Sequence, residues 1–261
     1  MANGRQNGLW SGLYAMALGI CLTACGQVDP LSELPQGETG RVVRIIDGDA
    51  LVLDTGLTVR LVGVEAPAPE RRTRKGQPYA GESARLLEDL SLGRQVRLIY
   101  PGITRDRYDR ALAYVVTDDA LGATFWLNEE VLRQGAARAR FYPDTAALGE
   151  RLLAAEADAR LKRKGLWALS TYDIIPAADV AVDAIGFHVI SGTPGAILPA
   201  DDGDERAVCM RRLTGSPITL KVGQGAAELC RDNAPRLPAR LRGYLRDAHL
   251  EITHVLNAQP L

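Results

Sequence analysis

The sequence contains few aromatic, histidine and cysteine residues. Of its 261 residues, 5% are aromatic, three are histidine and four are cysteine. The shortage of aromatic residues predicts cores built from aliphatic side chains. No histidine or third cysteine stands at ligand spacing from a cysteine, which argues against a structural zinc site.

The chain also lacks a strong net charge. Its formal charge is −1, with 46% hydrophobic and 24% charged residues. This composition is typical of one or two globular domains and excludes a disordered or fibrous protein. Residues 41–170 contain 21 lysines and arginines against 18 acidic residues, whereas residues 171–261 contain 9 against 11. The modest basic excess therefore lies in the first of these regions.

A single apolar run stands at the N-terminus, and it is too short to span a bilayer comfortably. It extends from Leu9 to Ala24, follows the positive charge of Arg5, and ends in Leu-Thr-Ala-Cys25. This ending resembles the lipobox of bacterial lipoproteins, which predicts a signal peptide over residues 1–24 and a lipid on Cys25. An ordinary secretory signal or an uncleaved anchor remains the alternative.

Export of the protein has consequences for its location and its cysteines. Gly26, rather than aspartate, follows the lipid-bearing position and favours the outer membrane facing the periplasm. Residues 25–39 then form a polar tether. Cys209 and Cys230 are the pair left in the mature chain, and an oxidising compartment favours a disulfide between them. Two buried thiols are the alternative.

The pattern between residues 40 and 170 predicts a small α+β domain. Three short apolar segments occupy residues 41–67, and turns separate them. Helical spacing and strand-like runs alternate after these segments: helix 82–92, strands 96–100 and 111–116, and helices 127–134 and 148–161. Five strands with interleaved helices in this order indicate an OB-type β-barrel with packed helices.

The remainder predicts a second, smaller domain. Residues 171–183 are interpreted as a linker, and residues 184–261 as a β-rich domain for which an OB-like barrel is one candidate. A hairpin is expected across Arg246–His249. The histidines of this domain are scattered and indicate no convergent site, so a structural or partner-binding role is favoured.

The segment 41–67 carries the chemistry. Its turns, Asp47-Gly48-Asp49 and Asp54-Thr55-Gly56, are typical of antiparallel hairpins. The carboxylates of Asp49 and Glu65 and the guanidinium of Arg60 lie on this meander. Hard oxygen ligands beside a fixed guanidinium suit a hard cation and a phosphodiester.

Several motifs in a fixed order identify a family resemblance over about residues 40–168. They are Ile46-Asp-Gly-Asp49, Arg60-Leu-Val-Gly-Val-Glu-Ala-Pro67, Asp106-Arg-Tyr-Asp-Arg-Ala-Leu-Ala-Tyr114, Leu127-Asn-Glu129 with Leu132-Arg-Gln-Gly135, and Gly165-Leu-Trp167. Together they resemble the staphylococcal-nuclease-like (thermonuclease) family. The resemblance implies an OB-type barrel with three helices and a calcium-dependent phosphodiester hydrolase, an endonuclease, acting on DNA or RNA.

The resemblance also assigns roles to residues. Asp49 and Glu65, with the backbone carbonyl of Ala66, correspond to calcium ligands, although Glu65 replaces the aspartate usual in the family. Arg60 and Arg110 correspond to the arginines that hold the phosphate and stabilise the charge of the pentavalent transition state.

Further positions of the resemblance correspond to the nucleotide site. Arg107, Tyr108 and either Phe141 or Tyr142 are expected to line it, because an aromatic ring offers a stacking face. Asp47 is expected to shape its turn rather than to bind the metal.

One position departs from the family. Ala68 stands where the family has the glutamate that orients or deprotonates the attacking water. Glu70, two residues later, either replaces that glutamate through a two-residue insertion or belongs to a solvated loop. The sequence therefore predicts an envelope-anchored nuclease with full or weakened activity. A non-catalytic nucleic-acid-binding module and an envelope scaffold are the alternatives.

Overall fold

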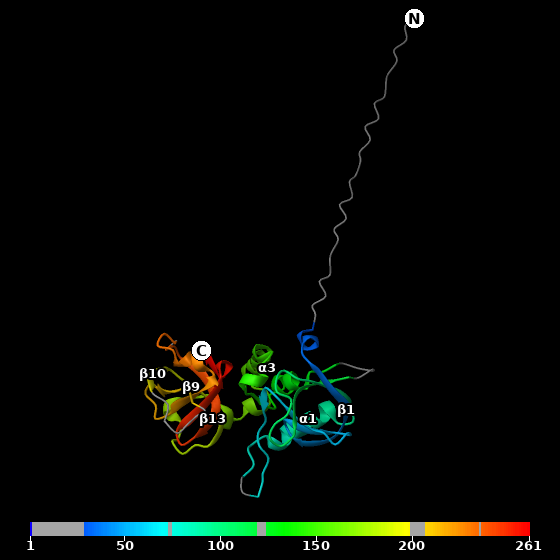
Figure 1. The fold of residues 1–261 in the computed structure, drawn as a ribbon, viewed down its shortest axis with the longest axis horizontal. Helices are drawn as coiled ribbons and strands as arrows, with labels where there is room; N and C mark the ends of the chain where they lie inside the picture. Colours follow the sequence, from blue (N-terminus) through cyan, green and yellow to red (C-terminus); the bar gives the residue numbers. More distant parts are fainter. Residues whose placement is uncertain (2–28, 73–74, 119–123, 199–206, 235) are drawn as a thin grey trace.

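The chain folds into two neighbouring units with helix α3 (Gly149–Leu161) between them (Figure 1). This computed structural model describes residues 1, 29–72, 75–118, 124–198, 207–234 and 236–261. The predicted lipid-bearing Cys25 and all of the predicted signal peptide except Met1 lie outside these ranges. Within the ranges, no helix has the length and apolar character needed to cross a membrane.

The first unit is a closed five-stranded barrel, as the sequence predicts. Its strands follow one another around the barrel in the order β1 (Gln36–Asp47), β2 (Ala50–Leu53), β3 (Thr58–Leu61), β6 (Ala111–Thr117) and β5 (Gln95–Ile99). The barrel interior is mostly aliphatic, with Leu51, Leu61 and Leu98 fully buried. Burial of these side chains stabilises the barrel, at roughly 1.5–3 kcal/mol for each.

Three helices and a short ribbon complete the first unit. The helices are α1 (Ala80–Ser91), α2 (Leu127–Arg133) and α3, and the ribbon pairs β4 (Val64–Glu65) with β7 (Arg138–Ala139). The predicted tether, residues 25–39, is shorter than expected. Strand β1 already begins at Gln36, where it pairs with Ile99, and Leu31 of the 3₁₀ turn η1 (Pro30–Glu33) is buried in the barrel core.

The turn between β1 and β2 packs closely against α1. A Cβ atom on Gly48 would lie 1.8 Å from the hydroxyl oxygen of Ser83 and 2.8 Å from Cβ of Ala66. Only glycine allows this approach without a shift of the neighbouring elements. The turn is therefore held in place, and with it the carboxylates on either side.

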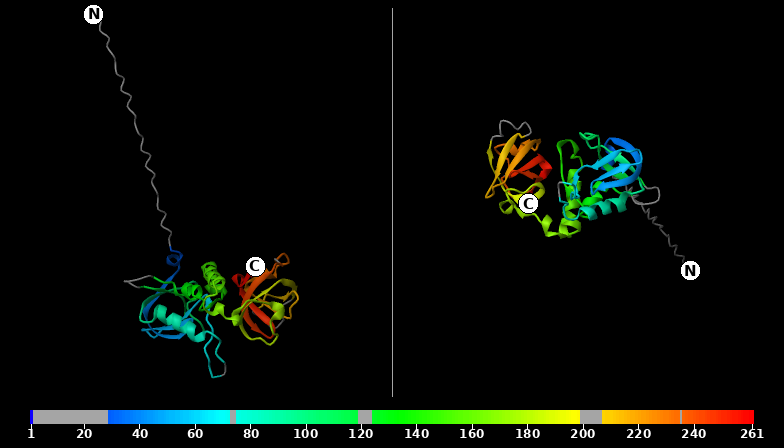
Figure 2. Two further views of the ribbon diagram at one scale, coloured as in Figure 1. Left: turned by 180° about the vertical axis from the view of Figure 1, so that it is seen from behind. Right: turned by 90° about the horizontal axis from the view of Figure 1, so that it is seen from below.

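The second unit is β-rich, as predicted, and its strands form one mixed sheet. Along the sheet the order is β10 (Pro194–Leu198), β11 (Cys209–Leu213), β12 (Thr219–Gly225), β14 (His249–His254), β13 (Ala239–Arg246), β9 (Gly186–Gly192) and β8 (Ile175–Pro176), with β15 (Ala258–Pro260) paired to β13. This order of seven strands, with β15 as the eighth beside it, differs from the five-stranded closed order of the barrel. Figure 2 shows the two units from two further sides.

The predicted hairpin across residues 246–249 is present. Asp247 and Ala248 both have positive φ, at 50° and 60°, as a two-residue type I′ turn requires. The predicted linker, by contrast, is part of the second unit. Ala177 and Val180 are buried in its core, and β8 pairs in parallel with β9. Apolar side chains inside the proposed linker explain why it packs rather than stands apart.

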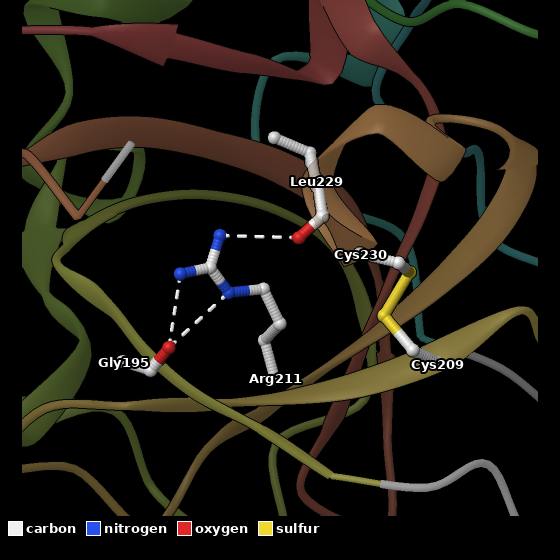
Figure 3. Close-up of a disulfide and its surroundings, with 5 residues drawn as sticks. All are labelled: Gly195, Cys209, Arg211, Leu229 and Cys230. Atoms are coloured by element: carbon white, nitrogen blue, oxygen red, sulfur yellow. Dashed lines mark hydrogen bonds between the residues drawn. A yellow bond between two sulfur atoms is a disulfide. The ribbon is translucent and has the colours of Figure 1, made fainter. Parts of the chain in front are cut away.

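A disulfide joins Cys209 of β11 to Cys230 at the end of the 3₁₀ turn η6 (Ala227–Cys230) (Figure 3). Beside it, the buried guanidinium of Arg211 donates to the carbonyl of Leu229 at 3.2 Å and to that of Gly195 at 2.9 Å. Burial lowers the pKa of Arg211 from its usual value. The disulfide and this arginine together fasten η6 to strands β10 and β11.

The two units meet through a buried polar junction. Arg242 of β13 donates through Nη1 to both carboxylate oxygens of Glu156 on α3, at 2.9 and 2.8 Å, and to the carbonyl of Ala139 at 3.1 Å. The side-chain amide of Asn257 donates to the carbonyl of Phe141 at 2.9 Å. These bonds fix the second sheet against the strand that follows α2.

Candidate functional site

Asp49 and Arg60 meet because their strands are paired. Ala50 of β2 lies opposite Arg60 of β3, which places Asp49 beside the guanidinium. The Asp49 carboxylate is 2% exposed, and its Oδ1 accepts a hydrogen bond from Nη1 of Arg60. Its Oδ2 accepts from the backbone N–H of Ala66 at 2.7 Å.

Glu65 approaches the same guanidinium from the short ribbon. Oε2 of Glu65 accepts from Nη2 of Arg60 at 3.0 Å and from Nη1 of Arg140 at 3.0 Å. The structure thus brings Asp49, Arg60 and Glu65 together as the sequence predicts. The guanidinium of Arg60 lies between the two carboxylates and forms an ion pair with each.

The electrostatics of the two carboxylates differ. Burial raises the pKa of Asp49 well above its usual value; Arg60 opposes this rise, and Asp47 and Glu65 add to it. Burial also acts to raise the pKa of Glu65, but Arg60 and Arg140 outweigh it, so the pKa of Glu65 is lowered. The ionised forms of Asp49 and Glu65 are therefore stable together only with a cation beside them.

Arg110 is held by the loop that precedes β6. The Asp106 carboxylate accepts from Nε and Nη2 of Arg110 at 2.7 and 2.6 Å, and from the backbone N–H of Tyr108 at 2.9 Å. Burial acts to raise the pKa of Asp106, but these hydrogen bonds and the charge of Arg110 lower it overall. The Arg110 side chain remains 35% exposed and is available to a ligand.

Both predicted phosphate-binding arginines line one cavity of about 470 Å³. Glu65 and Tyr142 line it as well, and so do two residues without a predicted role, Asp106 and Arg140. Tyr142 also borders a second hollow of about 220 Å³, whose other walls belong to β12 and β14 of the second unit. The cavity therefore holds three guanidinium groups, three carboxylates and one aromatic ring, and it lies next to a hollow that the second unit helps to form.

The remaining predicted nucleotide contacts are distributed unequally. Arg107 lies over the ring of Tyr108 at 4.7 Å and Arg110 at 5.7 Å, but neither Arg107 nor Tyr108 is among the residues lining the cavity. Tyr108 is 65% exposed. Of the two aromatic candidates, Phe141 is fully buried, whereas Tyr142 reaches the cavity.

Ala68 and Glu70 lie on the loop that follows the ribbon. The backbone of Ala68 is tied to Gln77, with its N–H donating to Oε1 at 2.8 Å and its carbonyl accepting from the Gln77 N–H at 2.9 Å. Glu70 is exposed and does not line the cavity. In this conformation the structure does not bring Glu70 to the two arginines.

The donor set suits a hard cation in its chemistry. Asp49 and Glu65 direct carboxylate oxygens at one position, which the guanidinium of Arg60 occupies. Ala66 binds Asp49 through its backbone N–H. Among the described residues, no three histidine, cysteine or acidic side chains converge as a ready-made metal cage. Calcium would therefore need Arg60 to leave the carboxylates.

Arg140 is a cleft residue that the sequence patterns do not single out. It follows β7 in the run Arg138-Ala-Arg-Phe-Tyr142, and residues two apart on an extended strand share a face. Spacing alone does not distinguish which of these arginines reaches the site. Its pairing with Glu65 depends on β4 and β7 being neighbours, which no local pattern encodes.

Comparison with known proteins places the barrel in a family. The family model described as "Staphylococcal nuclease homologue" matches residues 58–169. A "Thermonuclease" of Staphylococcus hyicus is 33% identical over 134 residues, covering 50% of this chain and 76% of that protein. A "Thermonuclease" of Staphylococcus intermedius is 31% identical over 135 residues, covering 51% and 77%. An "Uncharacterized endonuclease" of Escherichia coli is 33% identical over 130 residues, covering 49% and 76%. The closed barrel, its ordered motifs and these similarities agree, and the chain belongs to the staphylococcal-nuclease-like family.

Proposed function

We propose that the protein is a nuclease that hydrolyses phosphodiester bonds of DNA or RNA. One observation carries the proposal: Arg60 and Arg110 line a single cavity beside the buried Asp49 and the half-buried Glu65. Two guanidinium forks in one cleft match the geometry of a phosphate. The names of the related thermonucleases and endonucleases support the same reaction class.

Each arginine has a carboxylate partner that it must exchange for the substrate. Arg110 is held by Asp106, and Arg60 by Asp49 and Glu65. A phosphodiester entering the cavity offers oxygens to both guanidinium groups. As water attacks phosphorus, negative charge grows on those oxygens, and the prepositioned donors stabilise it.

We propose calcium as the cofactor, held by Asp49 and Glu65 once Arg60 has turned towards the phosphate. Hard carboxylate oxygens suit calcium, and the ion supplies positive charge near the reacting phosphate when bound.

The general base is the open element of the mechanism. Ala68 has no acid–base capacity, and the exposed Glu70 must move to reach the cleft. These two positions favour one alternative, a cleft that binds nucleic acid and cuts it slowly or not at all. Loss of a general base typically costs about 10²–10⁴-fold in rate, so metal and arginines can leave weak activity.

We also propose that the protein is lipid-anchored through Cys25 and acts in the bacterial cell envelope. The apolar N-terminal run ending in cysteine supports this location, and the disulfide in the second unit is consistent with an oxidising compartment.

A cleavage assay on single-stranded DNA and RNA tests the function. With the full chain, we expect cleavage in calcium and none in a chelator. We expect Arg110→Ala to lower the rate by about 10²–10³-fold, since it removes a donor to the developing charge. Arg133→Ala, which alters an arginine on α2 paired with Glu129 and Glu130, is the matched control and should cleave normally. Metal-independent cleavage, or full activity of Arg110→Ala, would contradict the mechanism.

Two further variants separate cutting from binding. If Glu70 is the base, Glu70→Ala should abolish most of the activity. If the cleft only binds, Glu70→Ala should change nothing, and Ala68→Glu should create or raise cleavage.

A further inference from the structure

Arg140 occupies the cleft on a backbone that is firmly fixed. Its N–H donates to the carbonyl of Gly63 at 3.1 Å, and its Nη1 donates to Glu65 at 3.0 Å. The side chain is 18% exposed and lines the cavity together with Arg60 and Arg110. A third guanidinium therefore belongs to the same cleft.

An aromatic bracket holds this guanidinium. Its carbon lies 4.8 Å from the ring centre of Tyr142, 5.4 Å from that of Tyr244 and 5.5 Å from that of Phe187. Phe187 of β9 and Tyr244 of β13 are directly opposite each other in the second sheet. Two of the three rings thus come from outside the barrel, as one cross-strand pair.

The bracket itself is fastened to the barrel. Nη1 of Arg138 donates to the carbonyl of Phe187 at 2.7 Å, and its guanidinium lies 4.9 Å from the Phe187 ring centre. Arg242, two residues before Tyr244 on the same strand, binds Glu156 of α3. The second sheet is consequently fixed at the place where it meets Arg140.

On the basis of the proposed nuclease function, we propose that Arg140 is a third phosphate-binding residue, which Phe187 and Tyr244 position. Its ligand would be a backbone phosphate of a nucleic acid lying in the cleft. Aromatic rings against its faces hold a guanidinium so that the N–H donors at its edge point in a fixed direction. Of the Arg140 donors, Nη1 is the one that binds Glu65. The second unit then completes the substrate site instead of being an appended domain.

Binding in a chelator tests the assignment without cleavage. The probe is a fluorescein-labelled single-stranded oligothymidylate, titrated with the full chain at several salt concentrations. Arg140→Gln should weaken binding about tenfold, the loss typical of one charge-assisted contact. It should also reduce the slope of log K against log salt by about 0.7, because one phosphate contact is lost. Arg140→Lys should keep the slope.

Arg151→Gln is the matched control. Arg151 also pairs with one carboxylate, Glu129, and lies 5.0 Å from the ring centre of Trp126, but it does not line the cavity. Its affinity and salt slope should stay those of the parent protein. If Arg140→Gln weakens binding without changing the slope, or leaves the affinity unchanged, the phosphate contact is refuted.

Tyr244→Leu tests the contribution of the second unit. Tyr244 is half-buried, and leucine keeps much of its apolar contact while removing the stacking face. We expect a several-fold weaker affinity, an unchanged salt slope and an unchanged melting temperature. Unaltered affinity would overturn the positioning role. If the protein binds the probe through Arg140 but never cleaves nucleic acid, the phosphate-binding role of Arg140 stands and only the proposed catalysis is refuted.

Discussion

Glu156 and Arg242 form a buried ion pair at the junction of the two units. We predict that replacing Glu156 alone destabilises the protein more than replacing both residues. The Arg242 side chain is 0% exposed and that of Glu156 is 1% exposed. The pair is joined by two hydrogen bonds of 2.9 and 2.8 Å, and Glu156 also accepts from the Ala139 N–H at 2.9 Å. Water cannot replace either partner without opening the interface.

Removal of one partner leaves a buried charge. Breaking such a pair typically costs about 3–5 kcal/mol. Arg242→Met belongs at the lower end, about 3 kcal/mol, because Arg160 lies 3.5 Å from the same carboxylate and partly compensates it. Glu156→Leu should cost more, since it leaves Arg242 buried and also removes the acceptor for Ala139.

The double variant removes both charges together. Its remaining cost is the loss of the hydrogen bonds to the N–H and carbonyl groups of Ala139 and of the carboxylate beside Arg160, about 1–3 kcal/mol. We therefore expect Glu156→Leu/Arg242→Met to be more stable than Glu156→Leu alone. The coupling should be about 3 kcal/mol, at the upper end of the range for residues in contact.

Urea unfolding can follow the two units separately. Trp126 and Trp167 are buried in the first unit, so their fluorescence reports on that unit, and amide hydrogen exchange of β13 reports on the second. The single variants should lower the midpoint of the β13 signal first, since that strand loses its anchor. If the two single costs add up to the cost of the double variant, the pair is not coupled and the reasoning fails.

Three other perturbations have clear expectations. Asn128→Ala should destabilise the barrel by about 2–3 kcal/mol in chemical denaturation, because the fully buried amide accepts from the Val115 N–H and donates to the Val62 carbonyl. Cys230→Ser should lower the stability of the second unit by about 3 kcal/mol, given the 21-residue separation that the disulfide closes; an unchanged melting temperature in oxidising buffer would contradict this. Glu38→Gln should lower the melting temperature at neutral pH but not in acid. The Tyr100 hydroxyl, with Arg105, lowers the pKa of Glu38, so its stabilisation is present above the unfolded-state pKa and is lost as pH falls through the folded-state value.

The barrel could be predicted from the sequence because its information is local. Tight turns at Asp47–Asp49 and Asp54–Gly56, alternation in the strands and helical spacing each act over a few residues. The pairing of β2 with β3 then follows from the short turn, and with it the contact between Asp49 and Arg60. Two members of the site can therefore be inferred from the amino-acid sequence alone.

The second unit was harder to predict for physical reasons. Strand β10 contains proline and glycine, which mark turns more often than strands, and β15 is a three-residue edge strand ending in a proline. The central parallel pair of β12 with β14 joins segments that are not consecutive in the chain. No local period encodes such a pairing, so the sheet order could not be predicted from spacing.

Arg140 illustrates the same limit within the functional site. Its importance rests on Glu65, 75 residues away, and on two rings that come from strands more than 40 residues further along the chain. A family resemblance covering the barrel says nothing of rings supplied from outside it. The bracket also gives a reason why the second unit is fastened by a buried ion pair rather than by a flexible linker. The rings of Phe187 and Tyr244 can hold the Arg140 guanidinium at a fixed distance from Arg60 and Arg110 only if the second sheet does not move relative to the barrel.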